Sequence, residues 1–505
     1  MKVKELFQFK NPRTRTLHLT WGAFFVSFFA WFNMAPLAGT MVESVGWLTM
    51  DHIAALAILN VALTIPARIF IGMLLDKYGP RKVFSILLVV MSIPTFMFAF
   101  GDTWMQLFIS RLLLSSIGAS FVVGIRMVSE WFPPKSVGFA EGFYAGWGNF
   151  GSAVAAIVLP WLAISAFGGD EGWRYAIAFT GVVCIIYGVI YWFTVSDTPE
   201  GKTYQKPRKI AAMEVSTYGD MIQLILWTIP LVGALGLLTW RLKNLNFVSE
   251  QAMYTVFIIL VIALIYQTIQ ILRVNLPILR KGVPEDDKYK FRNVAALNTT
   301  YFANFGAELA IVSMLPIFFL MTFELTATSA GLIASSFAFV NLFARPLGGW
   351  FSDRMKRRKT VMLLYMLGIG LGLLGMAFIN SGWPLYLAIG ITVLTSIFIQ
   401  GAEGATFAVI PLIKKRITGQ ISGMAGAYGN VGAVVYLTIF TLVTPQTFFF
   451  ILAGGAFFSF IFCWLFMEEP KGAHSDEYIL SSVDKESVTE NDEEKCEEKV
   501  TTRSA

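Results

Sequence analysis

Long apolar segments alternate with short polar ones along most of the chain. Each segment is long enough to cross a hydrocarbon core about 30 Å thick as an α-helix, which takes about 20 residues. This pattern predicts an all-α polytopic membrane protein. The segments lie at residues 17–40, 52–75, 83–101, 104–127, 138–166, 174–195, 221–240, 253–273, 294–321, 328–351, 360–380, 383–410, 420–443 and 447–467.

Composition supports a membrane protein and excludes several function classes. Hydrophobic residues make up 56% of the 505 residues and charged residues 14%, unlike a soluble domain. The first apolar segment is long and has no small-residue cleavage site after it, so we do not expect a cleaved signal peptide. The three cysteines and three histidines have no metal or redox spacing. No nucleotide-binding P-loop, HExxH or nucleophile motif is present, so we expect no enzymatic activity, no cofactor and no metal.

Basic residues are concentrated in alternate short loops. The net charge of +6 is therefore no sign of nucleic-acid binding. The positive-inside rule predicts a cytoplasmic N-terminus, and an even number of spans puts the C-terminus on the same side. Without a transit-type N-terminus, we expect the plasma membrane, or the inner membrane of a bacterium. The basic loops are those around residues 2–15, 77–82, 202–209, 354–359 and 414–416.

Two motifs occur twice in the same order, which indicates two similar halves. Residues 72–82 read G-x3-D-K-x-G-P-R-K and residues 349–359 read G-x3-D-R-x3-R-K. Residues 146–151 (GWGNFG) likewise match residues 427–432 (AYGNVG). Parallel six-helix halves with a site at their interface are typical of rocking-type secondary transporters. We predict an N-terminus at 1–16, a first half at 17–196, an insert at 197–293, a second half at 294–468 and a tail at 469–505.

The insert and the tail leave alternatives open. The two apolar segments of the insert are long enough to span, which gives 14 spans; helices lying on the membrane surface would give 12. Their apolar residues run all round the helix, which favours spanning. The acidic tail is expected to be disordered and cytoplasmic. It is either a solvated tail without a specific task or a regulatory segment that binds a partner.

Arg68 and Arg345 occupy matching positions in the two halves. Each lies four residues before a glycine and eight before an aspartate, Asp76 or Asp353. Eight helical residues span about 12 Å, so both guanidinium groups are expected near the membrane midplane. A charge there is costly and marks function by default, with an anion as partner. The alternative is a structural arginine paired with a buried carboxylate.

Asn149 and Asn430 lie in the repeated glycine-rich segments. Dense glycines allow helices to approach closely, which explains the glycines without a ligand. A buried amide in each copy needs hydrogen-bond partners, and it can donate to an anion without adding charge. We therefore expect both asparagines to contact substrate.

The loop pattern at 72–82 resembles the signature of the major facilitator superfamily, and the second copy departs from it with Lys356 in place of the loop glycine. The glycine-asparagine pair resembles the doubled nitrate signature of the nitrate/nitrite porter family within that superfamily. The resemblance implies a major facilitator fold with pseudo-two-fold symmetry and makes Arg68 and Arg345 the substrate arginines. It also implies that Phe28, Tyr301 and Phe305 contact nitrate or nitrite. Without the resemblance, these aromatic residues would be assigned to the hydrophobic core.

Buried acids are the remaining candidates. Glu308 and Glu403 lie within predicted spans, where a carboxyl group either couples protons or forms a buried salt bridge. Arg111 and Arg126 could be their partners. Asp76 and Asp353 resemble the superfamily's loop acids, which hold the inward gate. Arg126, near the cytoplasmic end, is expected to belong to a structural or gating pair.

Together these features predict uptake of nitrate and nitrite by alternating access, with the anion clamped between Arg68 and Arg345. Buried acids favour proton symport. Nitrate/nitrite exchange, a nitrate sensor that signals through the tail, and a carrier of another small organic anion are the alternatives. The expected partners are nitrate, nitrite, protons and the lipid bilayer, with no nucleic acid, and superfamily precedent suggests a monomer.

Overall fold

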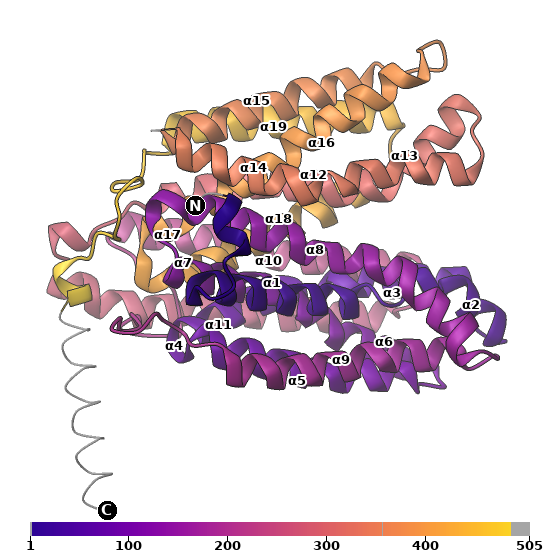
Figure 1. The fold of residues 1–505 in the computed structure, drawn as a ribbon, viewed down its shortest axis with the longest axis horizontal. Helices are drawn as coiled ribbons and strands as arrows, with labels where there is room; N and C mark the ends of the chain where they lie inside the picture. The colour runs from indigo at the N-terminus through magenta and orange to yellow at the C-terminus, as the bar shows by residue number, and fades with distance from the viewer. Residues whose placement is uncertain (1–2, 356, 486–505) are drawn as a thin grey trace, which may run out of the picture.

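The computed structural model describes residues 3–355 and 357–485. Within these ranges it contains 14 helices, some of them interrupted, that are long and apolar enough to cross a membrane, so the prediction of 14 spans is confirmed. Figure 1 shows the two halves lying along each other with their long helices running from end to end. The end that carries the basic loops at 77–82, 202–209, 354–359 and 414–416 is called the basic end below, and the opposite end is called the far end.

The helices are described below by the two halves and the insert. The first half contains α1 (Pro12–Trp31), α2 (Ala38–Ser44), α3 (Met50–Ala62), α4 (Thr64–Tyr78), α5 (Pro80–Ala99), α6 (Trp104–Leu114), α7 (Ser120–Trp131), α8 (Val137–Trp161) and α9 (Gly172–Thr194). The insert contains α10 (Tyr218–Asn244) and α11 (Glu250–Lys281). The second half contains α12 (Phe291–Phe323), α13 (Ala327–Phe339), α14 (Asn341–Arg354), α15 (Arg358–Ala377), α16 (Leu385–Phe407), α17 (Ile410–Ile413), α18 (Thr418–Phe440) and α19 (Pro445–Phe466).

Both arginine-bearing spans are interrupted just before the arginine. The second span breaks between α3 and α4, and Arg68 is the fifth residue of α4. Pro66 explains this break, because a proline cannot donate a hydrogen bond to the carbonyl four residues earlier. The eighth span breaks between α13 and α14, and Arg345 is the fifth residue of α14. The two arginines therefore occupy equivalent positions in the structure as well as in the sequence.

Glycines on the repeated helices let each half touch the other. A Cβ atom added at Gly423 of α18 would lie 2.4 Å from the carbonyl oxygen of Arg68. A Cβ atom added at Gly142 of α8 would lie 2.4 Å from the carbonyl oxygen of Arg345. Any side chain at these positions would force the helices apart. Each arginine helix is thus seated on the glycine-rich helix of the opposite half.

The hydrophobic core is shared at one end of the bundle and divided at the other. One large cluster of buried residues combines both halves and the insert, and it includes Phe121, Tyr301 and Phe407. A second cluster, around Phe319 and Phe449, contains only residues of the second half. A third, around Leu56 and Trp173, contains residues of the first half and the far-end residues of the insert, such as Leu242. The halves are therefore joined at the basic end and packed separately at the far end.

Helix α10 of the insert packs on α18 and α12 of the second half and also touches α3, while α11 packs on α10. Tyr428 of α18 donates a hydrogen bond to the carbonyl of Trp227 on α10. Helix α11 exposes a row of large apolar side chains, among them Ile258, Ile262 and Ile265. A helix of 32 residues that exposes such side chains suits a position in contact with lipid.

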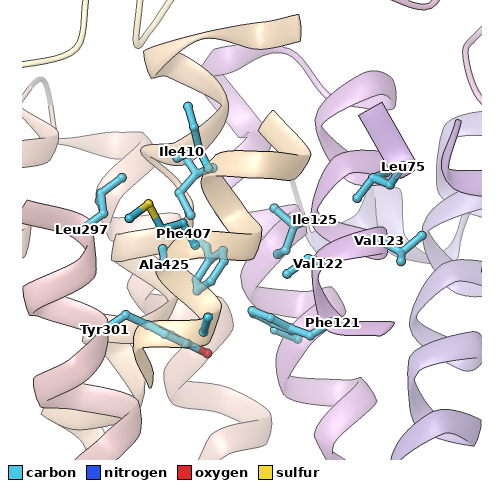
Figure 2. Packing of buried hydrophobic residues seen from close by; sticks show 14 of the residues in the cluster. Leu75, Phe121, Val122, Val123, Ile125, Leu297, Tyr301, Phe407, Ile410 and Ala425 are labelled. Atoms are coloured by element: carbon cyan, nitrogen blue, oxygen red, sulfur yellow. The ribbon is translucent and has the colours of Figure 1, made fainter. Parts of the chain in front are cut away.

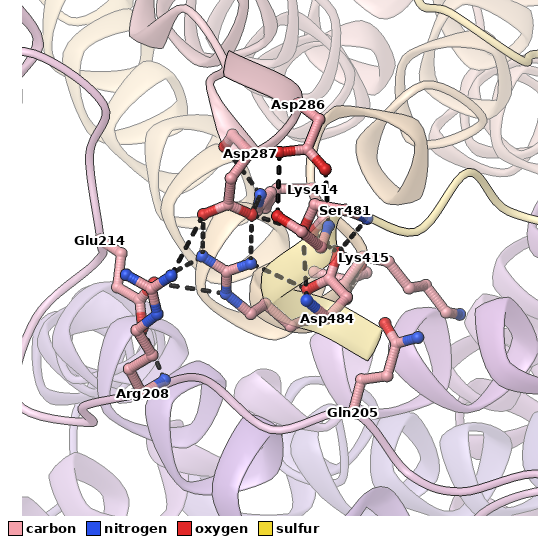
Figure 3. Close-up of polar contacts among 12 residues, drawn as sticks. Gln205, Arg208, Glu214, Asp286, Asp287, Lys414, Lys415, Ser481 and Asp484 are labelled. Atoms are coloured by element: carbon pink, nitrogen blue, oxygen red, sulfur yellow. Dashed lines mark hydrogen bonds and ion pairs between the residues drawn. The ribbon is translucent and has the colours of Figure 1, made fainter. Parts of the chain in front are cut away.

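Residues 471–485, called the C-terminal strap below, cross the basic end in contact with both halves, and Figure 3 shows the contacts around Ser481 and Asp484. Asp484 pairs with Arg416 at 2.8 Å, and the Ser481 hydroxyl donates to Asp287 Oδ1 at 2.6 Å. Near the other end of the strap, Lys135 of the first half donates its backbone N–H to the Ser475 carbonyl at 3.3 Å. The predicted disorder of residues 469–505 is thus corrected for the strap, because basic groups of the loops neutralise its acids. Residues 486–505 lie outside the described part of the chain.

Candidate anion site between the two halves

Arg68 projects from α4 into the interface and is 1% exposed. Its Nε donates to the carbonyl of Gly118 at 3.2 Å, and its Nη1 donates to the carbonyl of Gly426 in the second half. Its guanidinium carbon lies 5.4 Å from the ring centre of Phe121 and 5.5 Å from that of Phe305. Among the described residues no carboxylate pairs with Arg68. Its charge is held by carbonyl oxygens and ring faces, which leaves it able to bind an anion.

Arg345 is held in a different way, by two carboxylates. Its Nη2 lies 3.4 Å from Glu308 Oε2 and also forms an ion pair with Glu403. Asn341, one helical turn earlier on α14, donates to Glu308 Oε1 at 2.8 Å. Neither Arg111 nor Arg126 takes this role. Arg111 instead donates to Asn33 and to the carbonyl of Trp31.

Two positive and two negative charges therefore meet in one buried region. Arg68 and Arg345 are close enough for their charges to act on each other. Glu308 is 6% exposed and Glu403 is 1% exposed. With both carboxylates ionised, the pair of arginines is neutralised and no surplus charge remains in the empty site. This balance matters because an uncompensated charge inside a dry bundle is costly.

Four aromatic rings from both halves line this region, and Figure 2 shows three of them, Phe121, Tyr301 and Phe407. Tyr301 and Phe305 are stacked, with ring centres 5.0 Å apart and planes 6° apart. Phe121 of the first half is parallel to Tyr301, with ring centres 6.2 Å apart. Phe407 stands edge-on to both Phe121 and Tyr301, at 4.6 and 4.7 Å. The apolar faces of these rings line the region around the arginines.

Several polar atoms around the site have no hydrogen-bond partner among the described residues. They include the hydroxyl of Tyr301, Nε of Arg345 and the side-chain oxygen of Asn430. Buried polar atoms are nearly always paired, so unpaired ones need an explanation. The hydroxyl and the guanidinium nitrogen are donors, and a small anion with several oxygens would satisfy them. Asn430 is tied to the site because its amide nitrogen donates at 3.4 Å to the carbonyl of Gly426, which also binds Arg68.

The structure brings most of the predicted site residues together but leaves two apart. Asn149 is half-buried and its side-chain oxygen has no partner, and no described hydrogen bond or ion pair joins it to Arg345. Phe28 packs on Phe24, whose ring is 5.5 Å from that of Phe121. Phe28 is thus one ring removed from the aromatic wall in this conformation.

Asp76 and Asp353 join the halves at the basic end. Asp76 accepts the backbone N–H groups of Gly419 and Gln420 at 2.8 and 2.9 Å, at the start of α18. Asp353 accepts those of Gly138 and Phe139 at 2.9 and 2.7 Å, at the start of α8. Each acid therefore caps the glycine-rich helix of the opposite half, where helix-end N–H groups and the helix dipole favour an anion.

Arginines hold both of these acids in position. Arg126 Nε lies 3.5 Å from Asp76 Oδ1, and Arg126 also donates to the carbonyls of Gln205 and Lys415. Arg358 Nη2 lies 2.8 Å from Asp353 Oδ1. Together the two acids and two arginines join the halves at the basic end, and we call them the gate pairs.

Asn341, Phe121 and Phe407 belong to the site but are not among the sequence candidates. Asn341 could have been found, because it lies four residues before Arg345 and so shares its helical face. Phe407 lies four residues after Glu403 and follows from the same spacing. Phe121 carries no such signal, since its position depends on how the halves pack.

The family model described as Major Facilitator Superfamily matches residues 20–284 and 297–486. Nitrate/nitrite transporter NrtP of Picosynechococcus sp. is 44% identical over 513 residues, covering 94% of this chain and 96% of that protein. The protein of the same name from Nostoc punctiforme is 46% identical with the same coverage. High affinity nitrate transporter 2.5 of Arabidopsis thaliana is 28% identical, over 86% of this chain and 75% of its own length.

Solved structures resemble the fold at low sequence identity. A double-tryptophan mutant of XylE matches with a TM-score of 0.63 and 16% identity, covering 91% of this chain and 97% of that one. The human organic anion transporter MFSD10 matches with a TM-score of 0.59 and 12% identity, covering 90% of this chain and 100% of that one. At this level of identity the likeness concerns the fold alone.

Proposed function

Because the chain belongs to the major facilitator superfamily, we propose that it takes up nitrate and nitrite by alternating access. Relatives named as nitrate/nitrite transporters match nearly the whole chain. The observation that carries the proposal is the pair of buried arginines, one from each half, beside the aromatic wall. A planar oxyanion fits the parallel donors of a guanidinium group, and flat ring faces disfavour tetrahedral sulfate or phosphate.

Substrate binding uses Arg68 and Arg345 from opposite halves, with Tyr301 and Asn430 as further donors. Phe305 and Tyr301 cover the anion, while Phe28 and Asn149 reach it in another stage of the cycle. Because the arginines come from different halves, binding the anion draws the halves together. Closing the site around the anion is then the transport step itself.

Proton symport follows from the charge balance of the site. An anion that binds Arg345 competes with Glu308 and Glu403 for the same guanidinium group. The displaced carboxylate is left in a dry, unpaired setting and takes up a proton. One anion and one proton then enter together, and the neutral empty site can return without a substrate. Nitrate/nitrite exchange is the alternative, and it would require that the empty site cannot return.

The orientation follows from the loops. The positive-inside rule makes the basic end cytoplasmic, with both termini on that side, in a plasma membrane or a bacterial inner membrane. The shared core and the closed gate pairs at the basic end then correspond to an outward-facing conformation. The C-terminal strap would regulate opening of this end, either alone or through a partner protein. We expect the transporter to work as a monomer.

Flux measurements in liposomes test the proposal. With purified protein, an acidic exterior should accelerate nitrate and nitrite uptake, and nitrate or nitrite, unlike sulfate, should raise the thermal stability. Uptake that ignores the pH gradient but is accelerated by internal nitrite would replace symport with exchange. If neither anion is transported or stabilises the protein, another small organic anion or a sensor role becomes the better explanation. Loss of regulation after deletion of the residues beyond Pro470, with uptake unchanged, would favour a transporter with a regulatory tail over a sensor.

A further inference from the structure

Glu141 is a buried carboxyl group that the anion site does not use. It lies on α8 between Gly138, whose N–H binds Asp353, and Gly142, which packs on the carbonyl of Arg345. It is 1% exposed, and neither of its carboxyl oxygens has a hydrogen-bond partner among the described residues. No described cation forms an ion pair with it either. Glu141 thus lies between the anion site and the gate pairs, and no described group pairs with its carboxyl group.

Charged groups surround Glu141 but are engaged elsewhere. Arg358, Asp353, Lys415 and Tyr478 are the groups close enough to act on it electrostatically. Arg358 is bound to Asp353 and to the carbonyls of Pro134 and Ala473. Lys415 lies 3.2 Å from Glu130 and donates to the carbonyl of Ser129.

Tyr478 of the C-terminal strap closes this region from the basic end. Its ring centre lies 4.2 Å from Nζ of Lys415, and its buried hydroxyl has no hydrogen-bond partner among the described residues. Burial holds the pKa of Tyr478 well above its ordinary value, so the phenol stays neutral. Tyr478 therefore brings no charge that would neutralise an ionised Glu141.

The corresponding position in the other half is not acidic. Ser422 of α18 follows Gly419 at the same spacing, and its hydroxyl donates to the Gly419 carbonyl at 3.0 Å. The repeated gate pairs therefore do not require an acid here. An ionised, unpaired carboxylate at this depth would cost several kcal/mol, whereas the protonated form does not carry that cost.

We propose that Glu141 carries a proton while the basic end is closed and releases it when that end opens to water. Glu141 is thus a positioning residue that links the closed gate to one bound proton, in addition to the proton carried with the anion. This inference rests on alternating access but not on the identity of the anion. Since the closed form binds one more proton than the open form, rising pH destabilises the closed form. The equilibrium should shift by up to about tenfold per pH unit.

A distance measurement across the basic end tests this directly. Spin labels at Lys82, in the first turn of α5, and at Arg357, just before α15, report opening without any need for transport, and both residues are exposed. The full-length protein, with its native cysteines replaced, is measured between about pH 5 and pH 8, where an ordinary carboxyl group in water is ionised. The open population should grow as pH rises. In Glu141→Gln, which mimics the protonated form, the closed form should persist across this range.

Two further variants make the result decisive. Glu141→Asp keeps a carboxyl group and should keep the pH dependence, which controls for misfolding of the glutamine variant. Glu308→Gln alters the anion site and should leave the opening at the basic end dependent on pH. If Glu141→Gln opens with rising pH as the parent protein does, the inference is wrong. Failure of nitrate transport in liposomes, by contrast, would count against the proposed substrate and leave this result untouched.

Discussion

The guanidinium group of Arg345 lies 3.4 Å from the carboxylate of Glu308, measured from Nη2 to Oε2, and both side chains are buried. Arg68, its counterpart in the other half, is bound by backbone carbonyls and has no carboxylate partner among the described residues. The two arginines are therefore equivalent in position but not in electrostatic setting. In the proposed mechanism, Arg68 receives the anion directly, whereas Arg345 exchanges a carboxylate for it.

Replacing either arginine with lysine should nearly abolish uptake. Arg68→Lys and Arg345→Lys keep the charge but lose the planar pair of donors. The loss of two charge-assisted hydrogen bonds, each contributing about 1.5–3 kcal/mol, predicts a fall of about 100-fold or more in uptake rate. Initial nitrate uptake into proteoliposomes measures it, with the exposed Arg357→Lys as control. Retained transport in either variant would refute the clamp.

Variants of the two carboxylates should lose proton coupling while keeping anion exchange. In Glu308→Gln and Glu403→Gln, Arg345 loses one charged partner and the site can no longer release and bind a proton at that group. We expect uptake driven by a pH gradient to fall at least about tenfold. Exchange of external nitrate for internal nitrite should persist, since it needs no net proton movement. If both variants respond to the pH gradient like the parent protein, the proton must travel by another group.

Loss of the gate acids should open the basic end. Asp76→Asn and Asp353→Asn each keep one carbonyl acceptor but lose the charge that binds two helix-end N–H groups and an arginine. The expected destabilisation of the closed form is about 1–3 kcal/mol for each acid. Spin labels at Lys82 and Arg357 should report more open protein. Since the two acids are on opposite halves, their effects should add; unchanged distances in the double variant would contradict the gating role.

A methyl group at the contact between the halves should be enough to impair transport. In Gly423→Ala, the added Cβ would lie 2.4 Å from the Arg68 carbonyl oxygen, so α4 and α18 must separate. We expect a loss of stability of about 1–3 kcal/mol and a clear fall in uptake. The matched control is Gly454→Ala, where no atom lies within 4 Å of the added Cβ. Equal behaviour of the two variants in thermal unfolding and uptake would argue against close seating of Arg68.

Removing one ring of the C-terminal strap should loosen the closed form. Tyr478→Ala removes a half-buried side chain whose ring lies over Lys415 at the basic end. The expected cost to the closed form is about 1–3 kcal/mol. Limited proteolysis after residue 470 should become faster, and the spin-label pair should show more opening. Asp484→Asn, which weakens the ion pair with Arg416, should act in the same direction. Unaltered proteolysis in both variants would show that the strap does not hold the basic end.

Several features could be predicted from the chain alone because they depend on local pattern. The spans follow from apolar segments of sufficient length, and the two halves follow from repeated loop and glycine motifs. The matched depth of Arg68 and Arg345 follows from their equal spacing to Gly72 and Gly349. Resemblance to a family supplied Tyr301 and Phe305, which would otherwise be indistinguishable from core residues. The sequence by itself thus determined the fold class, the sign of the substrate and the helices that bear the site.

Only the tertiary structure decided which groups meet. Glu403 lies far from Arg345 in the sequence, and nothing in local spacing pairs them; the packing of α14 against α16 does. The seating of Arg68 on α18 of the other half, the cap that Asp76 forms there and the course of the strap are likewise long-range contacts. Whether one charge neutralises another depends on the distance between them in space, and not on their separation along the chain. For that reason the charge balance of the site came from the fold, although the buried acids alone already favoured proton symport.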